Sequence, residues 1–218
     1  GEEFPIRATY FREGHDAVAG TAVLTAPDGT QHTWEMTPCE PKGWNRYEAW
    51  VSCDTEGPWT FRVEAWDDPW ETWHHNAEVK LAAGMDVALM LMEGRALFNE
   101  AADAADPISQ DDAAALRRLA QLSDPDTAET PAHGRDAEIL GAVARELMAQ
   151  HRPRRLISPT QEFPLYCDRQ RALFGAWYEF FPRSQGAYRD ENGQWVSGTF
   201  DSSHERLEAA AAMGFDVV

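Results

Sequence analysis

The stretch that most constrains the fold lies near the C-terminus, where the aromatic residues 174–181 are followed at once by a proline. Aromatic side chains suit the pleated surface of a sheet, so this run predicts a buried strand. Downstream, Ser202 and Glu205 have the spacing of a helix-start box, and Gly214 supplies a helix stop. Residues 215–218 then open a second strand. Strand, helix and strand in this order predict the βαβ unit of a parallel sheet.

A parallel sheet needs more than two strands, with helices over its faces. The chain before residue 171 offers no further parallel strands, because its patterns are those of an antiparallel sandwich and a helical bundle. Residues 171–218 are therefore expected to be the first strand, helix and strand of a truncated (β/α)8 barrel. The chain is then the front part of a longer protein, and the remainder of the barrel is its partner.

Short strands are predicted from the N-terminus to about residue 91. Turn signals separate the runs, at residues 27–29, 41–43 and 55–58. Strand-like runs fall at residues 17–25, 31–36 and 46–51. Residues 59–66 alternate with period two, which indicates a strand with one face on a core. Residues 71–77 are expected to return as its partner strand. Strands at this spacing predict an all-β, immunoglobulin-like sandwich.

From residue 92 to about residue 155 the composition changes to strong helix formers. Ser109 and Asp112 form a helix-start box. A second helix, ended by Arg152 and Pro153, has one face marked by Ile139, Leu140, Val143, Leu147 and Met148. A polar loop at residues 123–134 separates the two helices, and residues 159–168 return as a strand. The expected domains are the sandwich (1–91 and 156–170), an inserted helical domain (92–155) and the barrel start (171–218).

The charge balance excludes some classes of partner. The net charge is −18, from 37 acidic residues against 19 Lys and Arg, whereas nucleic acids and anionic membranes require clustered basic residues. No apolar run approaches the length of a membrane span, and no signal peptide opens the sequence. Three cysteines without CxxC spacing are best explained as thiols in a reducing cytosol, although a Cys39–Cys53 bridge is conceivable. The expected location is cytoplasmic.

Several segments resemble a known family. FGAWYEFFPRS (174–184), GTF (198–200) and AAMGFDVV (211–218) are similar to the first barrel strand and the entry to the second in bacterial maltose-1-phosphate maltosyltransferases of the GlgE type. These enzymes belong to glycoside hydrolase family 13, the α-amylase superfamily. FREGHD (11–16) and GPWTFRV (57–63) resemble the N-terminal sandwich domain of the same family. The resemblance spans essentially the whole chain in the same order.

The resemblance implies a helical domain inserted in the sandwich, and a homodimer formed through these N-terminal domains. It also implies transfer of maltosyl units from α-maltose 1-phosphate to the non-reducing ends of α-1,4-glucans, with release of phosphate. That transfer is retaining and uses two carboxylates, an aspartate nucleophile and a glutamate acid/base. No cofactor and no essential metal is implied. The catalytic residues lie on later barrel strands, so no catalytic residue is expected in this chain.

Glu179 and Arg183 are candidate substrate contacts, with Ser184 beside them. They follow the predicted barrel strand, at the end where barrel enzymes place their active sites. A carboxylate there can contact substrate, and Arg183 can pair with a phosphate. The favoured interpretation is that both side chains form structural ion pairs.

Two groups of residues were weighed as metal ligands and set aside. Glu13, His15 and Asp16 share a loop with a central glycine, which favours a turn over a site with defined ligand spacing. His74 and His75 are neighbours on a predicted strand and would point to opposite faces. No metal is expected.

Seven of the nine tryptophans fall in the predicted sandwich: Trp34, Trp44, Trp50, Trp59, Trp66, Trp70 and Trp73. Alternation places Trp59 and Trp66 on opposite faces, so they are not all expected to be core. Exposed rings favour either an interface or the stacking of sugars, and Trp66 and Trp70 are the candidates for glucan stacking.

The sequence thus predicts a non-catalytic region that supports the barrel and forms the dimer. Two alternatives stay open: an α-glucan-binding module of another enzyme in the superfamily, and a stand-alone assembly domain whose last strand pairs with a second copy.

Overall fold

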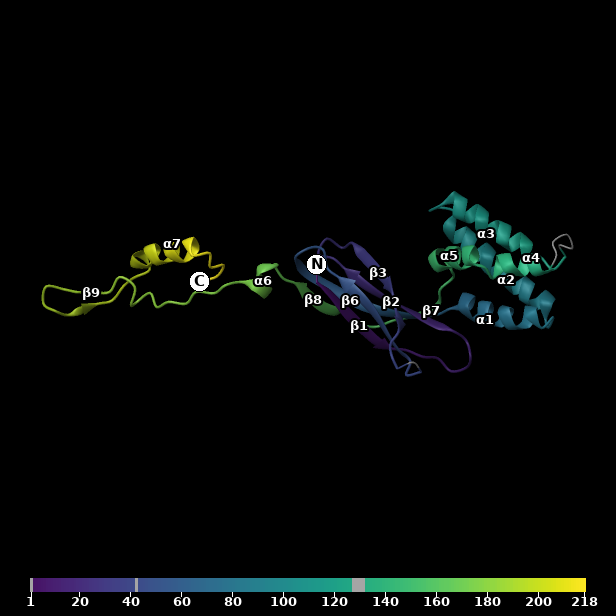
Figure 1. Ribbon diagram of the computed structural model, residues 1–218, viewed down its shortest axis with the longest axis horizontal. Helices are drawn as coiled ribbons and strands as arrows, with labels where there is room; N and C mark the ends of the chain where they lie inside the picture. Colours follow the sequence, from purple (N-terminus) through teal and green to yellow (C-terminus); the bar gives the residue numbers. More distant parts are fainter. Residues whose placement is uncertain (1, 42, 127–131) are drawn as a thin grey trace. The chain divides into compact units, whose positions relative to one another are not determined.

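The computed structural model describes residues 2–41, 43–126 and 132–218. They divide into two compact units, residues 1–165 and residues 166–218. The first unit combines two antiparallel sheets with helices α1–α5, and Figure 1 identifies its elements along the chain. This arrangement agrees with the predicted mixed class, a sandwich with added helices.

The larger sheet of the first unit has the strand order β3-β2-β6-β7, with β8 also pairing with β6. Its strands are β2 (Val18–Thr25), β3 (Gln31–Glu35), β6 (Gly57–Asp67), β7 (Arg155–Pro159) and β8 (Phe163–Cys167). Three of the predicted strand runs are confirmed here, those at residues 17–25, 31–36 and 59–66. The strand predicted at residues 159–168 is confirmed as β8, while β7 lies almost wholly before the predicted range.

The smaller sheet has the order β1-β5-β4, from β1 (Glu3–Thr9), β5 (Arg46–Ser52) and β4 (Thr37–Pro38). Strand β5 approaches β2 and β3 of the larger sheet. Both sheets contribute buried apolar side chains, among them Ile6, Val51, Leu24, Trp59 and Val63. Burial of apolar surface between strands of the two sheets is what stabilises a sandwich.

Helix α1 (Pro69–Ala82) corrects the prediction of a strand at residues 71–77, which was wrong. The side chain of Asp68 caps the helix by accepting a hydrogen bond from the Glu71 amide, and Pro69 occupies the first turn. Trp70, Trp73 and Ala77 recur at helical spacing and are buried. The argument that His74 and His75 point to opposite faces of a strand rested on the same prediction. On the helix, His74 is buried and its neighbour is exposed.

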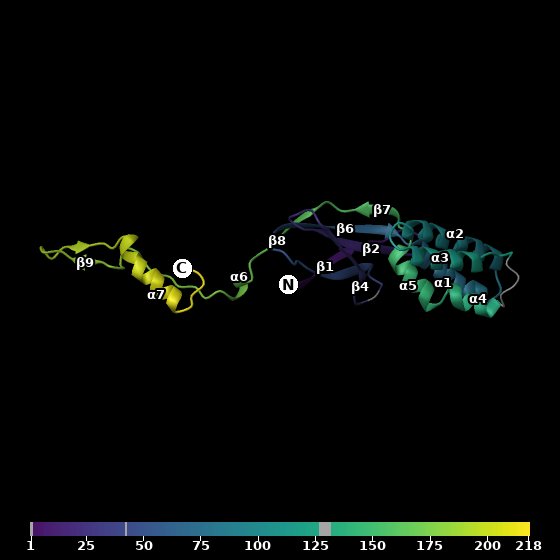
Figure 2. The same cartoon turned by 90° about the horizontal axis from the view of Figure 1, so that it is seen from above.

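The remaining helices of the first unit are α2 (Val87–Ala105), α3 (Gln110–Leu122), α4 (Ala132–Ile139) and α5 (Ala142–His151). The Ser109 cap is confirmed, because its hydroxyl accepts a hydrogen bond from the Asp112 amide at 3.3 Å. The helix predicted before Arg152 is confirmed as α5, while Ile139 ends α4 instead. Of the predicted polar loop at 123–134, residues 127–131 lie outside the described residues. Figure 2 shows α1–α5 as one group.

The helices leave the larger sheet and return to it at the same place. Strand β6 ends at Asp67, and β7 pairs with it antiparallel with Arg155 opposite Asp67. The helical segment is therefore inserted between two neighbouring strands. Its first helical residue is Pro69, well before the change of composition at residue 92.

The second unit contains α6 (Arg171–Phe174), the hairpin of β9 (Tyr188–Arg189) and β10 (Trp195–Val196), the 3₁₀ turn η1 (Asp201–Ser203) and α7 (His204–Ala212). The predicted buried strand is reduced to one parallel bridge, between Trp177 and Val217. Trp177 and Phe181 are each 70% exposed. The prediction of burial was wrong, because the described residues supply no further strands to cover this pair.

Helix α7 confirms the helix predicted from the apolar spacing after residue 203. Gly214, at φ 85°, confirms the predicted stop, since a left-handed residue at this position suits glycine. The predicted box is not formed. Ser203 is the N-cap residue and makes no capping side-chain hydrogen bond, while the Ser202 hydroxyl accepts one from the Thr199 amide. Among the described residues no helix combines the length and apolar character needed to cross a membrane.

Candidate functional site

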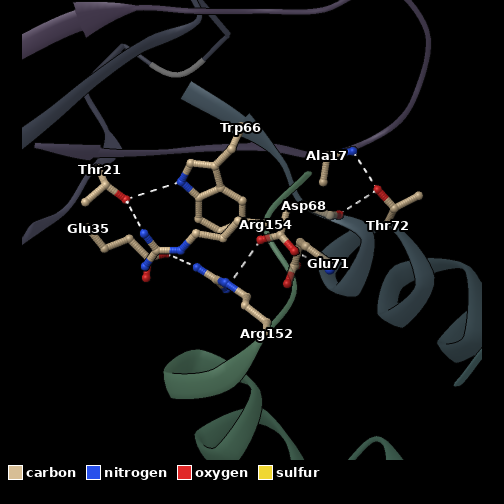
Figure 3. A network of polar contacts seen from close by, with 9 residues as sticks. All are labelled: Ala17, Thr21, Glu35, Trp66, Asp68, Glu71, Thr72, Arg152 and Arg154. Carbon is tan, nitrogen blue, oxygen red and sulfur yellow. Dashed lines mark hydrogen bonds and ion pairs between the residues drawn. The ribbon is translucent and has the colours of Figure 1, made fainter. Parts of the chain in front are cut away.

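Trp66 is the centre of a polar network where the larger sheet meets the helices (Figure 3). Its indole nitrogen donates a hydrogen bond to the Thr21 hydroxyl at 3.2 Å. The guanidinium groups of Arg152 and Arg154 lie 5.1 Å and 5.0 Å from its ring centroid. Cation–π contacts of this kind stabilise a buried ring most when water is excluded.

Asp68 joins the same network from the start of α1. Its side chain is 4% exposed and lies 3.4 Å from Arg152, which also pairs with Glu35. Burial raises the pKa of the Asp68 carboxyl, against the opposing effects of the Glu71 amide and the Arg152 charge.

Backbone contacts tie the network to the loop before β2. The Thr72 hydroxyl donates to the Asp68 carbonyl and accepts from the Ala17 amide at 2.8 Å. The network therefore links β2, β3, β6, α1 and the segment after α5. The polar groups of the network find their partners within the protein, as expected for a network that holds the sheet and the helices together.

Neither candidate stacking ring has a face for a sugar. Trp66 and Trp70 are each 2% exposed. Trp70 packs in the helical core, with ring centroids 5.2 Å from Trp73 and 5.5 Å from Phe98. The assignment of glucan stacking to these two residues is corrected accordingly. Trp59 is buried as well, so alternation along β6 exposes neither of its rings. The prediction that the seven tryptophans are not all core is confirmed by Trp44 and Trp50, which are 65% and 54% exposed.

Glu179 lines an open groove of about 850 Å³ in the second unit. Its walls are mostly apolar, with Trp177, Phe180 and Phe200 among them, and Asp201 and His204 add polar groups. Such a surface suits a partner that buries apolar area more than it suits a charged substrate.

Arg183 is not brought to this groove. The side chain is exposed, and its carbonyl oxygen accepts a hydrogen bond from the Gly198 amide at 2.9 Å. Within the described parts of the chain, neither Glu179 nor Arg183 forms an ion pair, so the favoured interpretation of structural ion pairs is not observed. Ser184 donates its amide to the Phe181 carbonyl. These residues do not form a catalytic arrangement in the second unit.

The two groups weighed as metal ligands also have other partners. Asp16 lies 3.4 Å from Arg12, and Gly14 turns the loop at φ 105°. His74 lies 3.2 Å from the Leu140 carbonyl oxygen and receives a hydrogen bond from Arg145. The residues that the structure describes contain no group of three or more side chains suited to a metal ion. Cys39, Cys53 and Cys167 are thiols and form no disulfide, as predicted.

Comparison with known proteins identifies the family to which this chain belongs. The protein-family model of the alpha-1,4-glucan:maltose-1-phosphate maltosyltransferase domain N/S matches residues 1–169. The chain belongs to this maltosyltransferase family.

Individual maltosyltransferases extend the match over the whole chain. An alpha-1,4-glucan:maltose-1-phosphate maltosyltransferase of Arcanobacterium haemolyticum is 43% identical over 223 residues, covering 100% of this chain and 31% of its own length. The second such enzyme of Streptomyces coelicolor is 42% identical over 218 residues, with the same coverage. The Mycobacterium tuberculosis enzyme is 34% identical over 248 residues, covering 34% of its length. The chain spans about a third of these curated relatives.

The exposure of Phe11 and Trp44 was not predicted from the sequence. They are 71% and 65% exposed. Both lie outside the strands, Trp44 directly after Gly43 and Phe11 three residues before Gly14. Loop placement is the sequence signal that favours their exposure.

Proposed function

We propose that this chain is the non-catalytic front region of a protein that transfers maltosyl units from maltose 1-phosphate to α-1,4-glucans. The observation that carries the proposal is the match of the entire chain to about a third of maltosyltransferases that bear this name. The remainder of the longer protein supplies the catalytic residues.

In this proposal the first unit is an immunoglobulin-like sandwich carrying a helical insertion, which runs from Pro69 to His151 and so begins earlier than the predicted residue 92. Residues 171–218 begin the catalytic barrel. The parallel bridge between Trp177 and Val217, with α7 as the crossover, supports a barrel start. The open aromatic groove beside this bridge is then covered by later barrel elements. The location is proposed to be cytoplasmic, which agrees with three thiols outside disulfides.

The first unit is also proposed to form a homodimer. Its support is the resemblance to a family that associates through these domains, together with exposed apolar side chains on the helices such as Val79, Leu89 and Met92. Sedimentation of the 218-residue chain tests it: a mass of two chains is expected at micromolar concentration, and one chain at every concentration would contradict it.

The activity is tested with the gene from which this sequence comes. The coding sequence is read past Val218, the longer protein is expressed, and phosphate release from maltose 1-phosphate is measured with a glucan acceptor. Release by the longer protein and none by the 218-residue chain is expected. A reading frame that stops at Val218, or a longer protein that releases no phosphate, would overturn the proposal.

A further inference from the structure

Phe11 and Trp44 lie in neighbouring loops at one end of the β1–β5 pair. Thr9 faces Arg46 at this end, and one residue further the Tyr10 amide donates to the Asn45 carbonyl at 3.2 Å. The next residue on one loop is Phe11, and the preceding residue on the other is Trp44. Two mostly exposed rings therefore project from adjacent backbone segments. This surface is called the Phe11–Trp44 surface below.

A small pocket of about 180 Å³ adjoins Phe11. The residues that line it include Arg12, Asp67 and Leu156, with the buried Trp66 beneath them. The volume is below that of sites for drug-sized ligands, and it has room for about one sugar-sized ring. The pocket lies between the loop after β1 and the strands β6 and β7, so a rigid sheet forms its floor.

The charged groups of the pocket are the Arg12 guanidinium and the Asp67 carboxylate, held together as an ion pair, and Tyr10 and Ser158 also line it. The Arg12 side chain is 36% exposed and that of Asp67 is 21% exposed, so both retain hydrogen-bonding capacity toward solvent. A donor and an acceptor fixed side by side can bind neighbouring hydroxyl groups, which act as both donors and acceptors. Leu156, 78% exposed, has a left-handed backbone at φ 51°. Bulky residues avoid this conformation, and such strain occurs preferentially at ligand sites.

We propose that the Phe11–Trp44 surface binds a neutral α-glucan, with one glucosyl ring in the pocket beside Phe11 and another against Trp44. The apolar face of a sugar ring packs on an aromatic face, while its hydroxyls reach Arg12 and Asp67. A neutral polyol also suits a chain of net charge −18, which disfavours anionic ligands. The choice of an α-glucan rests on the proposed function, whereas the location rests on exposure and pocket geometry alone.

The test is a titration of the 218-residue chain with maltoheptaose, followed by tryptophan fluorescence and by calorimetry. Saturable binding is expected, and Phe11→Ala and Trp44→Ala each raise Kd by about tenfold, since each removes a stacking face. Asp67→Asn raises Kd by about fivefold, because a charged hydrogen bond becomes a neutral one.

Trp50→Ala is the matched control. Trp50 is 54% exposed on β5 and does not line the pocket, so its loss leaves Kd within about twofold. Cellohexaose, whose β-linked chain is straight, serves as the ligand control and is expected to bind more weakly. Circular dichroism confirms that each variant is folded.

Three results would overturn the inference. The first is no saturation up to about 10 mM maltoheptaose, which is a weak affinity by any standard, and the second is an equal effect of Phe11→Ala and Trp50→Ala on Kd. The third is conversion of a dimer to a monomer by Phe11→Ala, which would assign the surface to a second copy. Failure of the proposed function is seen separately, as a lack of phosphate release by the longer protein. Binding without such release supports the surface, and release without binding refutes the surface alone.

Discussion

Arg152 places one guanidinium against two carboxylates and one indole ring. Its side chain is 12% exposed, so the charge is largely removed from water and depends on Asp68, Glu35 and the Trp66 ring for compensation. Removing one partner of a buried pair leaves the other charge uncompensated, which is more damaging than the pair is stabilising. The two members of the Arg152–Asp68 pair therefore differ in what their loss does.

Arg152→Ala is expected to lower the free energy of unfolding by about 3 kcal/mol, because it leaves the Asp68 carboxylate buried without its counter-charge. Asp68→Asn is expected to lower it by about 1 kcal/mol or less, since asparagine keeps the helix cap and Arg152 keeps Glu35. Urea unfolding at pH 7, followed by circular dichroism, measures both changes. Equal losses in the two variants would contradict this account.

The contribution of Asp68 to the free energy of unfolding depends on pH with a defined sign. Burial raises the pKa of Asp68, so the folded protein binds a proton at this carboxyl at higher pH than the unfolded chain, whose carboxyl titrates near about pH 4. Ionisation of Asp68 therefore works against folding as the pH rises through this window. The deficit of Arg152→Ala is expected to shrink when unfolding is repeated at a pH low enough to protonate this carboxyl. A deficit that is the same at both pH values would show that Asp68 is not its cause.

At the scale of elements, α1 and α2 pack closely at a glycine. A Cβ atom placed on Gly94 of α2 would come within 2.4 Å of the Trp73 ring of α1, whose indole nitrogen donates to the Met90 carbonyl at 2.8 Å. The ring is held on two sides, so it has no freedom to retreat. Gly94 is thus needed for packing, although glycine weakens a helix.

Gly94→Ala is expected to lower the free energy of unfolding by about 1–3 kcal/mol, despite the better helix propensity of alanine. The matched control is Gly134→Ala in α4, where nothing lies within 4 Å of the added methyl group. That change is expected to raise stability by up to about 1 kcal/mol. If both variants gain stability, the close approach of α1 and α2 is not a constraint.

The sequence predicted correctly those elements that are determined by residues close to one another in the chain. The alternation in β6, the Ser109 cap of α3 and the glycine stop of α7 all rest on neighbouring residues. Helix α1 was missed because its aromatic residues favour strands, although Asp68, Pro69 and the spacing of Trp70 and Trp73 indicate a helix. The burial of Trp66 had no local signal, because the arginines that cover it come from the far end of the helical insertion. Burial of the rings of residues 174–181 requires neighbouring strands that the described residues do not include.

At the scale of the whole molecule, the two units differ in how their aromatic residues are used. In the first unit several large rings are buried, among them Trp59, Trp70 and Phe98. In the second unit Phe174 and Phe200 are 81% and 84% exposed. Exposed aromatic surface on this scale favours association with other apolar surfaces.

A chain that ends at Arg169, after β8, is expected to keep the thermal transition of the 218-residue chain within about 2 °C, because the core of the first unit is internal. It is also expected to bind much less of an apolar fluorescent dye. Calorimetry and dye fluorescence measure these two properties. As a control, Phe181→Ser with Phe200→Ser in the 218-residue chain reduces dye binding without changing the transition. A large fall in Tm on truncation would show that the second unit stabilises the first.

The pairing of Arg155 with Asp67 has a consequence for how this architecture can be remodelled. Because the backbone leaves and re-enters the sheet at one rung, the two ends of the helical segment are held at the distance of an ordinary hairpin. For the topology of the sheet, the helical segment is equivalent to a turn between β6 and β7, whatever its length. A two-residue hairpin loop, a reporter domain or a larger bundle could be grafted at this position while the strand order stays unchanged.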